Sequence, residues 1–133
     1  MAYVPIDRPA RLAPDLTVTH FEDADINLLD LYVAVVGGIQ PGLIQGRTFR
    51  NCRLQGPATL LISTGVTFRD TNFGDSAGDM RNLLLKPMGQ RALGTIPMRD
   101  CQFDNCAFIY VSFTGPESIL NELASIPVAG SAT

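Results

Sequence analysis

A short repeat constrains the fold of this chain more than any other feature of the sequence. Three seven-residue segments align without gaps on the pattern [Thr/Pro]-[Phe/Met]-Arg-[Asn/Asp]-[Cys/Thr]-x-[Leu/Phe], and they are Thr48–Leu54, Thr67–Phe73 and Pro97–Phe103. A second match flanks them, because Leu54–Leu61 resembles Phe113–Leu120. One copy of so short a unit cannot bury its apolar face alone, so the copies must stack and equivalent positions must form columns.

The spacing within the unit predicts which side chains point inward. Successive side chains of extended chain face opposite sides, and small residues suit a tight inner corner. The predicted inner columns are Phe49/Phe68/Met98, Cys52/Thr71/Cys101 and Leu54/Phe73/Phe103. The arginines that follow the first column, Arg50, Arg69 and Arg99, are then expected on one outer face.

The third unit continues in steps of five residues. Cys101–Asn105, Cys106–Tyr110 and Val111–Gly115 each place a small residue two positions before a Phe. In this respect the sequence resembles the pentapeptide-repeat proteins, over residues 47–56, 66–75 and 101–115. The resemblance implies a right-handed parallel β-helix. The run of fives is broken twice and Arg47 stands where that family has a small residue, so a short, irregular helix is expected.

These observations predict a mainly β chain of one domain, residues 1–133. Residues 1–45 should hold N-terminal strands, among them 16–21, while 26–33 fits either a strand or a helix. Residues 46–115 should form the coils of the β-solenoid, interrupted by a loop at 74–79 and by short strands at 82–86 and 92–96. Residues 116–126 should form a helix that caps one end of the solenoid or packs against a second subunit, followed by a tail at 127–133.

Composition and charge bound the location and the partners of the protein. The formal net charge is −3, which makes direct binding to nucleic acid unlikely. The N-terminus lacks the apolar stretch of a signal peptide, and no apolar run is long enough to cross a membrane. The three cysteines, Cys52, Cys101 and Cys106, show no metal-binding spacing and fit buried thiols. A cytoplasmic protein is therefore expected.

The sequence offers little to an enzyme. His20 is the only histidine, and no nucleophile elbow, phosphate-binding loop or metalloprotease motif is present. Glu22, Asp23 and Asp25 could supply oxygen ligands to a cation, but a solvated turn explains these residues equally well. We expect no catalytic residue, no metal and no cofactor.

The arginines carry the most informative chemistry. Stacked coils would bring Arg50, Arg69 and Arg99 close together on the outer face, with Arg53 extending the patch, and like charges in register repel one another. Two neutralising partners are open: the carboxylates of Asp70 and Asp100, or a bound anion such as a nucleotide or another phosphate compound.

The sequence thus predicts a non-enzymatic module that binds or sequesters a small anionic ligand at an arginine-lined surface. It is expected to form a homodimer or a higher oligomer, because a short solenoid leaves open ends and the 28–36 region is apolar. Two alternatives remain. The resemblance implies a protein that imitates DNA and inhibits topoisomerases, and a purely structural scaffold subunit is also possible.

Overall fold

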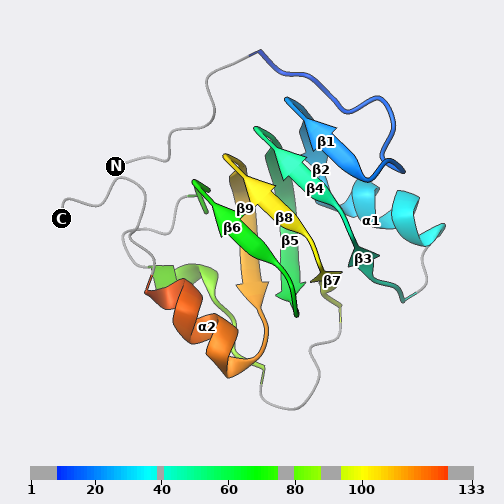
Figure 1. Ribbon diagram of the computed structural model, residues 1–133. Coiled ribbons are helices and arrows are strands. Elements are labelled where there is room, and N and C mark those ends of the chain that lie inside the picture. The colour runs from blue at the N-terminus through cyan, green and yellow to red at the C-terminus, as the bar shows by residue number, and fades with distance from the viewer. Residues whose placement is uncertain (1–8, 39–40, 75–79, 88–93, 126–133) are drawn as a thin grey trace.

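Two parallel β-sheets face each other in the structure, a computed structural model that describes residues 9–38, 41–74, 80–87 and 94–125 (Figure 1). The first sheet has the order β1-β4-β8-β6, in which the strands are β1 (His20–Glu22), β4 (Thr48–Arg50), β8 (Gln102–Asp104) and β6 (Thr67–Arg69). The second sheet has the order β2-β5-β7-β3, in which the strands are β2 (Asp25–Asn27), β5 (Arg53–Ile62), β7 (Ile96–Arg99) and β3 (Ile44–Gln45). Strand β9 (Ala107–Thr114) also pairs with β5. The prediction of a mainly β chain is confirmed, and its sheets are parallel.

The turns between the sheets explain the Asn/Asp position of the repeat. The chain leaves each strand of the first sheet through a residue with positive φ, and these residues are Asp23, Asn51, Asp70 and Asn105. Asn and Asp adopt this left-handed conformation more readily than other residues that carry a β-carbon. Three of these side chains are also linked, since the Asn51 amide donates to Asp23 at 2.5 Å and the Asn105 amide donates to Asn51 at 3.3 Å.

The C-terminal strands are inserted between earlier ones. Strand β8 lies between β4 and β6, and β7 lies between β3 and the end of β5. Strand β9 pairs with β5 on one side and, through Ala107, with Asn72 on the other. Residues 96–107 therefore separate two passes of the chain, 44–55 and 60–72, that are consecutive in sequence.

This insertion changes the register that the repeat predicts. Phe49 and Phe68 are both paired with Phe103, whereas Met98 lies in the other sheet opposite Ile44 and Ile62. The column Phe49/Phe68/Met98 is therefore wrong by one five-residue step. Both alignments keep apolar residues inward, but only the observed one places three aromatic rings in a single stack.

The other two columns shift by the same step. Cys52 is level with Cys106, and Cys101 lies at a different corner, where its thiol donates to the carbonyl of Ile44 at 3.7 Å. Leu54 is paired with Phe108, in place of Phe103. The ring of Phe73 stacks on Phe108 with centroids 5.9 Å apart, so Phe73 belongs to the Leu54 column as predicted.

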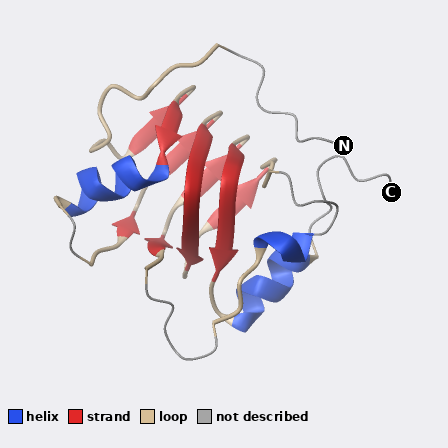
Figure 2. Cartoon of the chain, turned by 180° about the vertical axis from the view of Figure 1, so that it is seen from behind, coloured by secondary structure: helices blue, strands red, loops and turns tan. Residues whose placement is uncertain are grey.

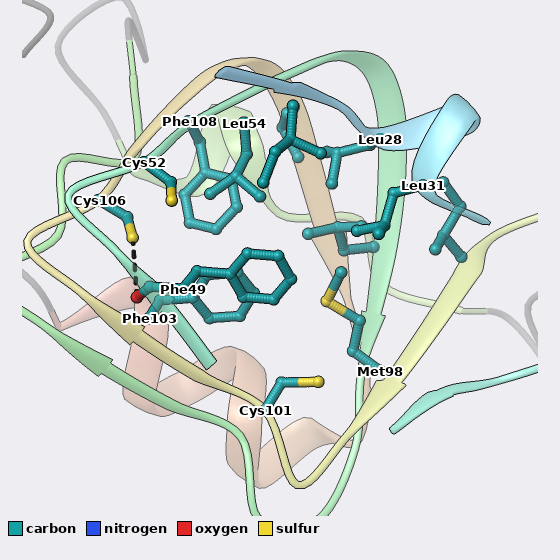
Figure 3. Packing of buried hydrophobic residues seen from close by; sticks show 14 of the residues in the cluster. Leu28, Leu31, Phe49, Cys52, Leu54, Met98, Cys101, Phe103, Cys106 and Phe108 are labelled. Carbon is teal, nitrogen blue, oxygen red and sulfur yellow. Dashed lines mark hydrogen bonds between the residues drawn. The ribbon is translucent and has the colours of Figure 1, made fainter. Parts of the chain in front are cut away.

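The core between the sheets contains a stack of four phenylalanine rings, of which Figure 3 shows Phe49 and Phe103. The centroids of Phe49 and Phe103 are 4.9 Å apart, those of Phe68 and Phe103 are 5.2 Å apart, and Phe21 stacks on Phe49 at 5.1 Å. The Cys106 thiol lies beside the stack and donates to the carbonyl of Phe49 at 3.2 Å. A hydrogen bond with Cys52, together with burial, raises the pKa of the Cys106 thiol, so this thiol stays protonated.

Helices lie at opposite ends of the sheets (Figure 2). Helix α1 (Leu28–Val36) begins directly after β2, with Asn27 as its N-cap, and ends at Gly37, whose φ of 86° is typical of a helix C-terminus. Its buried residues Leu28 and Leu31 pack near Met98 (Figure 3). The segment 26–33, which fitted either element, is thus a strand followed by a helix.

The C-terminal helix is confirmed as α2 (Glu117–Ala124), which buries Leu120 and Leu123 and packs beside the 3-10 helix η1 (Met80–Leu83). The predicted strand at 82–86 is wrong, since only Leu84 forms an isolated bridge, with Phe113. The predicted strand at 16–21 begins only at His20, because Asp15 accepts hydrogen bonds from Thr17 and closes a turn there.

Some predicted segments lie outside the described residues, namely 75–79 of the loop, 92–93 of the short strand, and the tail with residue 126 of the helix. In the part of the chain that the structure describes, no helix is long and apolar enough to cross a membrane.

The stacked rings give a graded prediction for stability. Phe103 is 1% exposed between two rings, whereas Phe68 ends the row and is partly exposed. Phe103→Ala should lower the free energy of unfolding by about 4 kcal/mol and Phe68→Ala by about 2 kcal/mol. Urea denaturation of both variants measures the two costs, and equal costs would contradict the central position of Phe103.

Candidate binding site

The four arginines of the predicted site do not form one patch. Arg50 and Arg69 share the outer face of the first sheet, but Asp104 is paired with both and lies between them. Arg99 lies in the second sheet, where it is paired with Gln45 and its guanidinium donates to the Gln45 side chain at 3.3 Å. The predicted column Arg50/Arg69/Arg99 is therefore wrong, for the same reason as the inner columns: the repeat shifts by five residues.

The outer row of the first sheet alternates in charge. Glu22, Arg50, Asp104 and Arg69 follow one another across the four strands. The guanidinium of Arg50 lies 3.7 Å from the Glu22 carboxylate, and both side chains are exposed. Opposite charges on neighbouring strands are favourable, and the formal charges of the row cancel. The repulsion expected between stacked arginines is thus avoided by carboxylates.

These carboxylates are not the predicted ones. Asp70 and Asp100 occupy positive-φ corners at the ends of strands, with φ of 49° and 53°. Asp100 accepts a hydrogen bond from the Gln45 amide at 3.3 Å. The repeat predicted that each arginine is neutralised by the aspartate that follows it in sequence. In the structure, the carboxylates beside the arginines belong to neighbouring strands.

Arg53 has a structural partner. Its Nε and Nη2 donate to the two oxygens of Asp25 at 2.7 and 2.9 Å, and Nη2 also donates to the carbonyl of Pro9 at 3.2 Å. The side chains of Arg53 and Asp25 are only 15% and 18% exposed. A bidentate pair of this kind fixes the position of β2 against β5 and leaves little of the guanidinium for a ligand.

The acidic residues near His20 are separated in space by their partners. Glu22 lies 3.8 Å from His20 and also faces Arg50, Asp23 accepts from Asn51, and Asp25 binds Arg53. Within residues 9–38, 41–74, 80–87 and 94–125, no three His, Cys, Asp or Glu side chains are arranged to hold a metal ion.

A groove that sequence reasoning missed lies beside β5, β9 and η1. Its volume is about 540 Å³, and it is lined by Pro57, Ala58, Thr59, Phe73, Asn82, Leu83, Tyr110, Val111 and Ser112. The Thr59 and Ser112 hydroxyls are hydrogen-bonded to each other at 2.7 Å. Hydroxyl, amide and aromatic groups line this space, and none of the described residues that line it carries a formal charge.

Tyr110 is the unusual residue of the groove. Its backbone has a φ of 60°, and the residue is 79% exposed to solvent. All other described residues with positive φ are Gly, Asn or Asp. The chain packs closely here, because a β-carbon on Gly56 would lie 2.1 Å from the carbonyl oxygen of Tyr110. A tyrosine is thus held in a conformation that disfavours it.

The sequence did contain a signal for this position. The fifth residues of the three consecutive five-residue units are Asn105, Tyr110 and Gly115. Asn and Gly are ordinary turn residues, and Tyr is not. The sequence alone thus shows a bulky aromatic residue at the fifth position of a unit. It does not show that Thr59 and Asn82 lie beside this residue, because both come from segments distant in sequence.

The Arg53–Asp25 pair gives a second prediction. Asp25→Asn leaves a mostly buried guanidinium without its counter-charge and should cost about 3 kcal/mol of unfolding free energy. The matched control Glu22→Gln removes an exposed partner and should cost about 0.5 kcal/mol. Chemical denaturation at neutral pH compares the two, and a cost for Asp25→Asn no greater than the control would rule out a structural role for the pair.

Comparison with known proteins yields no relative: no protein-family model, no curated protein and no solved structure matches this chain. The resemblance to pentapeptide-repeat proteins therefore stays a prediction.

Proposed function

We propose that this protein is a non-enzymatic binding module, built as a short parallel β-helix, that holds a small uncharged ring compound in the groove beside Tyr110. The proposal of a β-helix is supported by the parallel pairing of all named strands and by the positive-φ corners that recur at equivalent positions. Helices α1 and α2 would then close its two ends (Figures 1 and 2).

The observation that carries the binding proposal is the conformation of Tyr110. A left-handed backbone costs a residue with a β-carbon about 1 kcal/mol, and an exposed ring returns little of that energy through burial. Strained residues cluster at binding sites, where the side chain is retained for a contact outside the fold. Tyr110 combines strain and exposure at the edge of the groove.

The lining of the groove indicates the ligand class. A volume of about 540 Å³ lies within the range of small-molecule sites. The Tyr110 ring offers a flat surface for stacking, while Thr59, Ser112 and Asn82 offer neutral hydrogen-bond groups. Among the described residues that line the site, none carries a charge that would hold a phosphate. A nucleoside is a compound class that fits this combination of size, stacking surface and neutral hydrogen-bond groups.

The charged face provides less support for the other candidates. An anion at Arg50 and Arg69 would have to compete with Glu22 and Asp104. A DNA mimic would need a continuous row of carboxylates, whereas this row alternates in sign. Thermal-shift measurements on arginine variants and a topoisomerase assay distinguish these two candidates from binding in the groove.

The proposal predicts that one substitution raises stability and removes binding. Tyr110→Asn should raise Tm by about 3 °C, because Asn tolerates the corner conformation, and it should abolish the thermal shift caused by ligand. Tyr110→Phe keeps both the ring and the strain, so it should retain Tm and most of the ligand shift. Thermal melts with adenosine, guanosine, cytidine and uridine, and with their 5′-monophosphates, make the comparison.

Three results would overturn the proposal. A shift that survives Tyr110→Asn places the site elsewhere. A shift given only by the monophosphates, and lost in the Arg50→Ala/Arg69→Ala double variant, assigns binding to the arginine face. The absence of a shift with every compound favours a scaffold or a protein-interaction role, which inhibition of a topoisomerase would support.

A further inference from the structure

Strand β6 lies at one edge of the first sheet, with β8 on one side and no described strand on the other (Figure 1). The N–H of Thr67 donates to the carbonyl of Cys101 at 3.0 Å, on the β8 side. The carbonyl of Arg69 accepts from the N–H of Asn105 at 2.8 Å, on the same side. Because backbone groups alternate in direction along a strand, the N–H and the carbonyl of Phe68 point away from β8. The edge therefore presents one donor and one acceptor to an additional strand.

The side chains of β6 end two rows without completing them. The Phe68 ring stacks on Phe103 with centroids 5.2 Å apart and stays partly exposed. Arg69 is exposed, and within the described residues its guanidinium makes no ion pair, whereas Arg50 on the same face lies 3.7 Å from Glu22. The ring row can thus take a further apolar side chain inside the edge, and the charge row can take a further carboxylate outside it.

Strand β8 shows which residues suit a strand that lies beside an arginine strand in this sheet. It lies between β4 and β6, whose outward residues are Arg50 and Arg69, and it carries Phe103 inward and Asp104 outward. A strand on the open side of β6 would stand in the same relation to Arg69. Opposite charges on neighbouring strands are favourable, and a further ring would extend the stack. The register therefore calls for an inward aromatic or large apolar residue followed by an outward Asp or Glu.

The other sheet edges are less suited to an additional strand. At the opposite edge of the first sheet, Phe21 of β1 is 3% exposed, and Glu22 of the same strand already faces Arg50. In the second sheet, Leu12 forms a bridge to β2, and Ile44 of β3 is fully buried. Among the described strands, β6 alone combines an open backbone edge with a partly exposed ring and a cation that has no counter-ion.

We propose that β6 is a docking edge for an extended segment of a partner protein, in which an aromatic or large apolar residue is followed by Asp or Glu. The segment adds a strand to the first sheet, bonded to the N–H and the carbonyl of Phe68, with its carboxylate beside Arg69. In complexes of this kind the main-chain hydrogen bonds give affinity, and alternate side chains give specificity. Thr67, Phe68 and Arg69 do not line the groove beside Tyr110, so this inference does not depend on the proposed function.

Amide hydrogen exchange of the full chain, followed by nuclear magnetic resonance, tests the docking edge. The probe is the capped peptide Asp-Ser-Gln-Phe-Asp-Asn-Ser, which copies residues 100–106 with serine in place of cysteine. At saturating peptide the exchange of the Phe68 amide should slow roughly tenfold, because this N–H gains a hydrogen bond. The amide of Thr67, which is already bonded to Cys101, should exchange at an unchanged rate.

A charge exchange tests the specificity of the edge. A second peptide with Lys after Phe should bind the wild-type chain roughly fivefold more weakly than the first. Arg69→Glu should reverse this order, and Arg69→Ala should remove the difference between the peptides. The matched control is Arg50→Ala, on the same face but on an interior strand, and it should keep the wild-type preference.

Four results would overturn the inference. The first is a Phe68 amide that gains no protection at millimolar peptide. The second is equal binding of both peptides by the wild-type chain. The third is lost protection of the Phe103 amide, which would show that the peptide displaces β8 in place of adding to β6. The fourth is protection of Phe68 that rises with protein concentration without peptide, which would assign the edge to a second copy of the chain. Nucleoside binding enters none of these readouts, so this test and that of the proposed function fail independently.

Discussion

The ring of Phe103 joins parts of the chain that would otherwise remain separate. Phe49 and Phe68 belong to consecutive repeats, yet their rings stack on opposite faces of Phe103. In sequence, Phe103 lies 54 residues after Phe49 and 35 residues after Phe68. The row of four rings contributes to the apolar core, and β8 supplies the ring at its centre. The strand order, the hydrogen bond between the Cys52 and Cys106 thiols and the outer charge row all follow from the position of that strand.

The register has direct consequences for the surface. Each inward Phe of the first sheet is followed by an outward charged residue, and the four strands contribute Glu22, Arg50, Asp104 and Arg69 in turn. Had the repeats been adjacent, arginines would face each other at about 4.8 Å. Insertion of β8 places a carboxylate between them. Strand β8 therefore completes the aromatic stack with Phe103 and balances the charge of the outer face with Asp104. The cationic surface that the repeat predicts is absent from this described sheet.

Local features of the sequence were sufficient to predict local features of the fold. The repeated Phe indicated inward-facing extended segments, and the pattern after Pro116 indicated the helix that the structure has at Glu117–Ala124. The Asn/Asp positions were predicted to neutralise arginines, whereas the structure uses them as positive-φ corners. The register could not be predicted, because Met98 and Phe103 are one five-residue step apart and both fit the apolar position. Only packing between strands distant in sequence distinguishes them. The groove escaped prediction for the same reason, since Thr59 and Ser112 meet across β5 and β9.

The position of Phe103 is tested most directly by aromatic nuclear Overhauser contacts in a sample with selectively labelled phenylalanines. The account predicts contacts from the Phe103 ring to the rings of both Phe49 and Phe68, with no direct contact between Phe49 and Phe68. Direct contacts between Phe49 and Phe68, with Phe103 remote from both, would show that the repeats stack in sequence order. They would contradict the inserted position of β8, on which the charge row and the aromatic stack both depend.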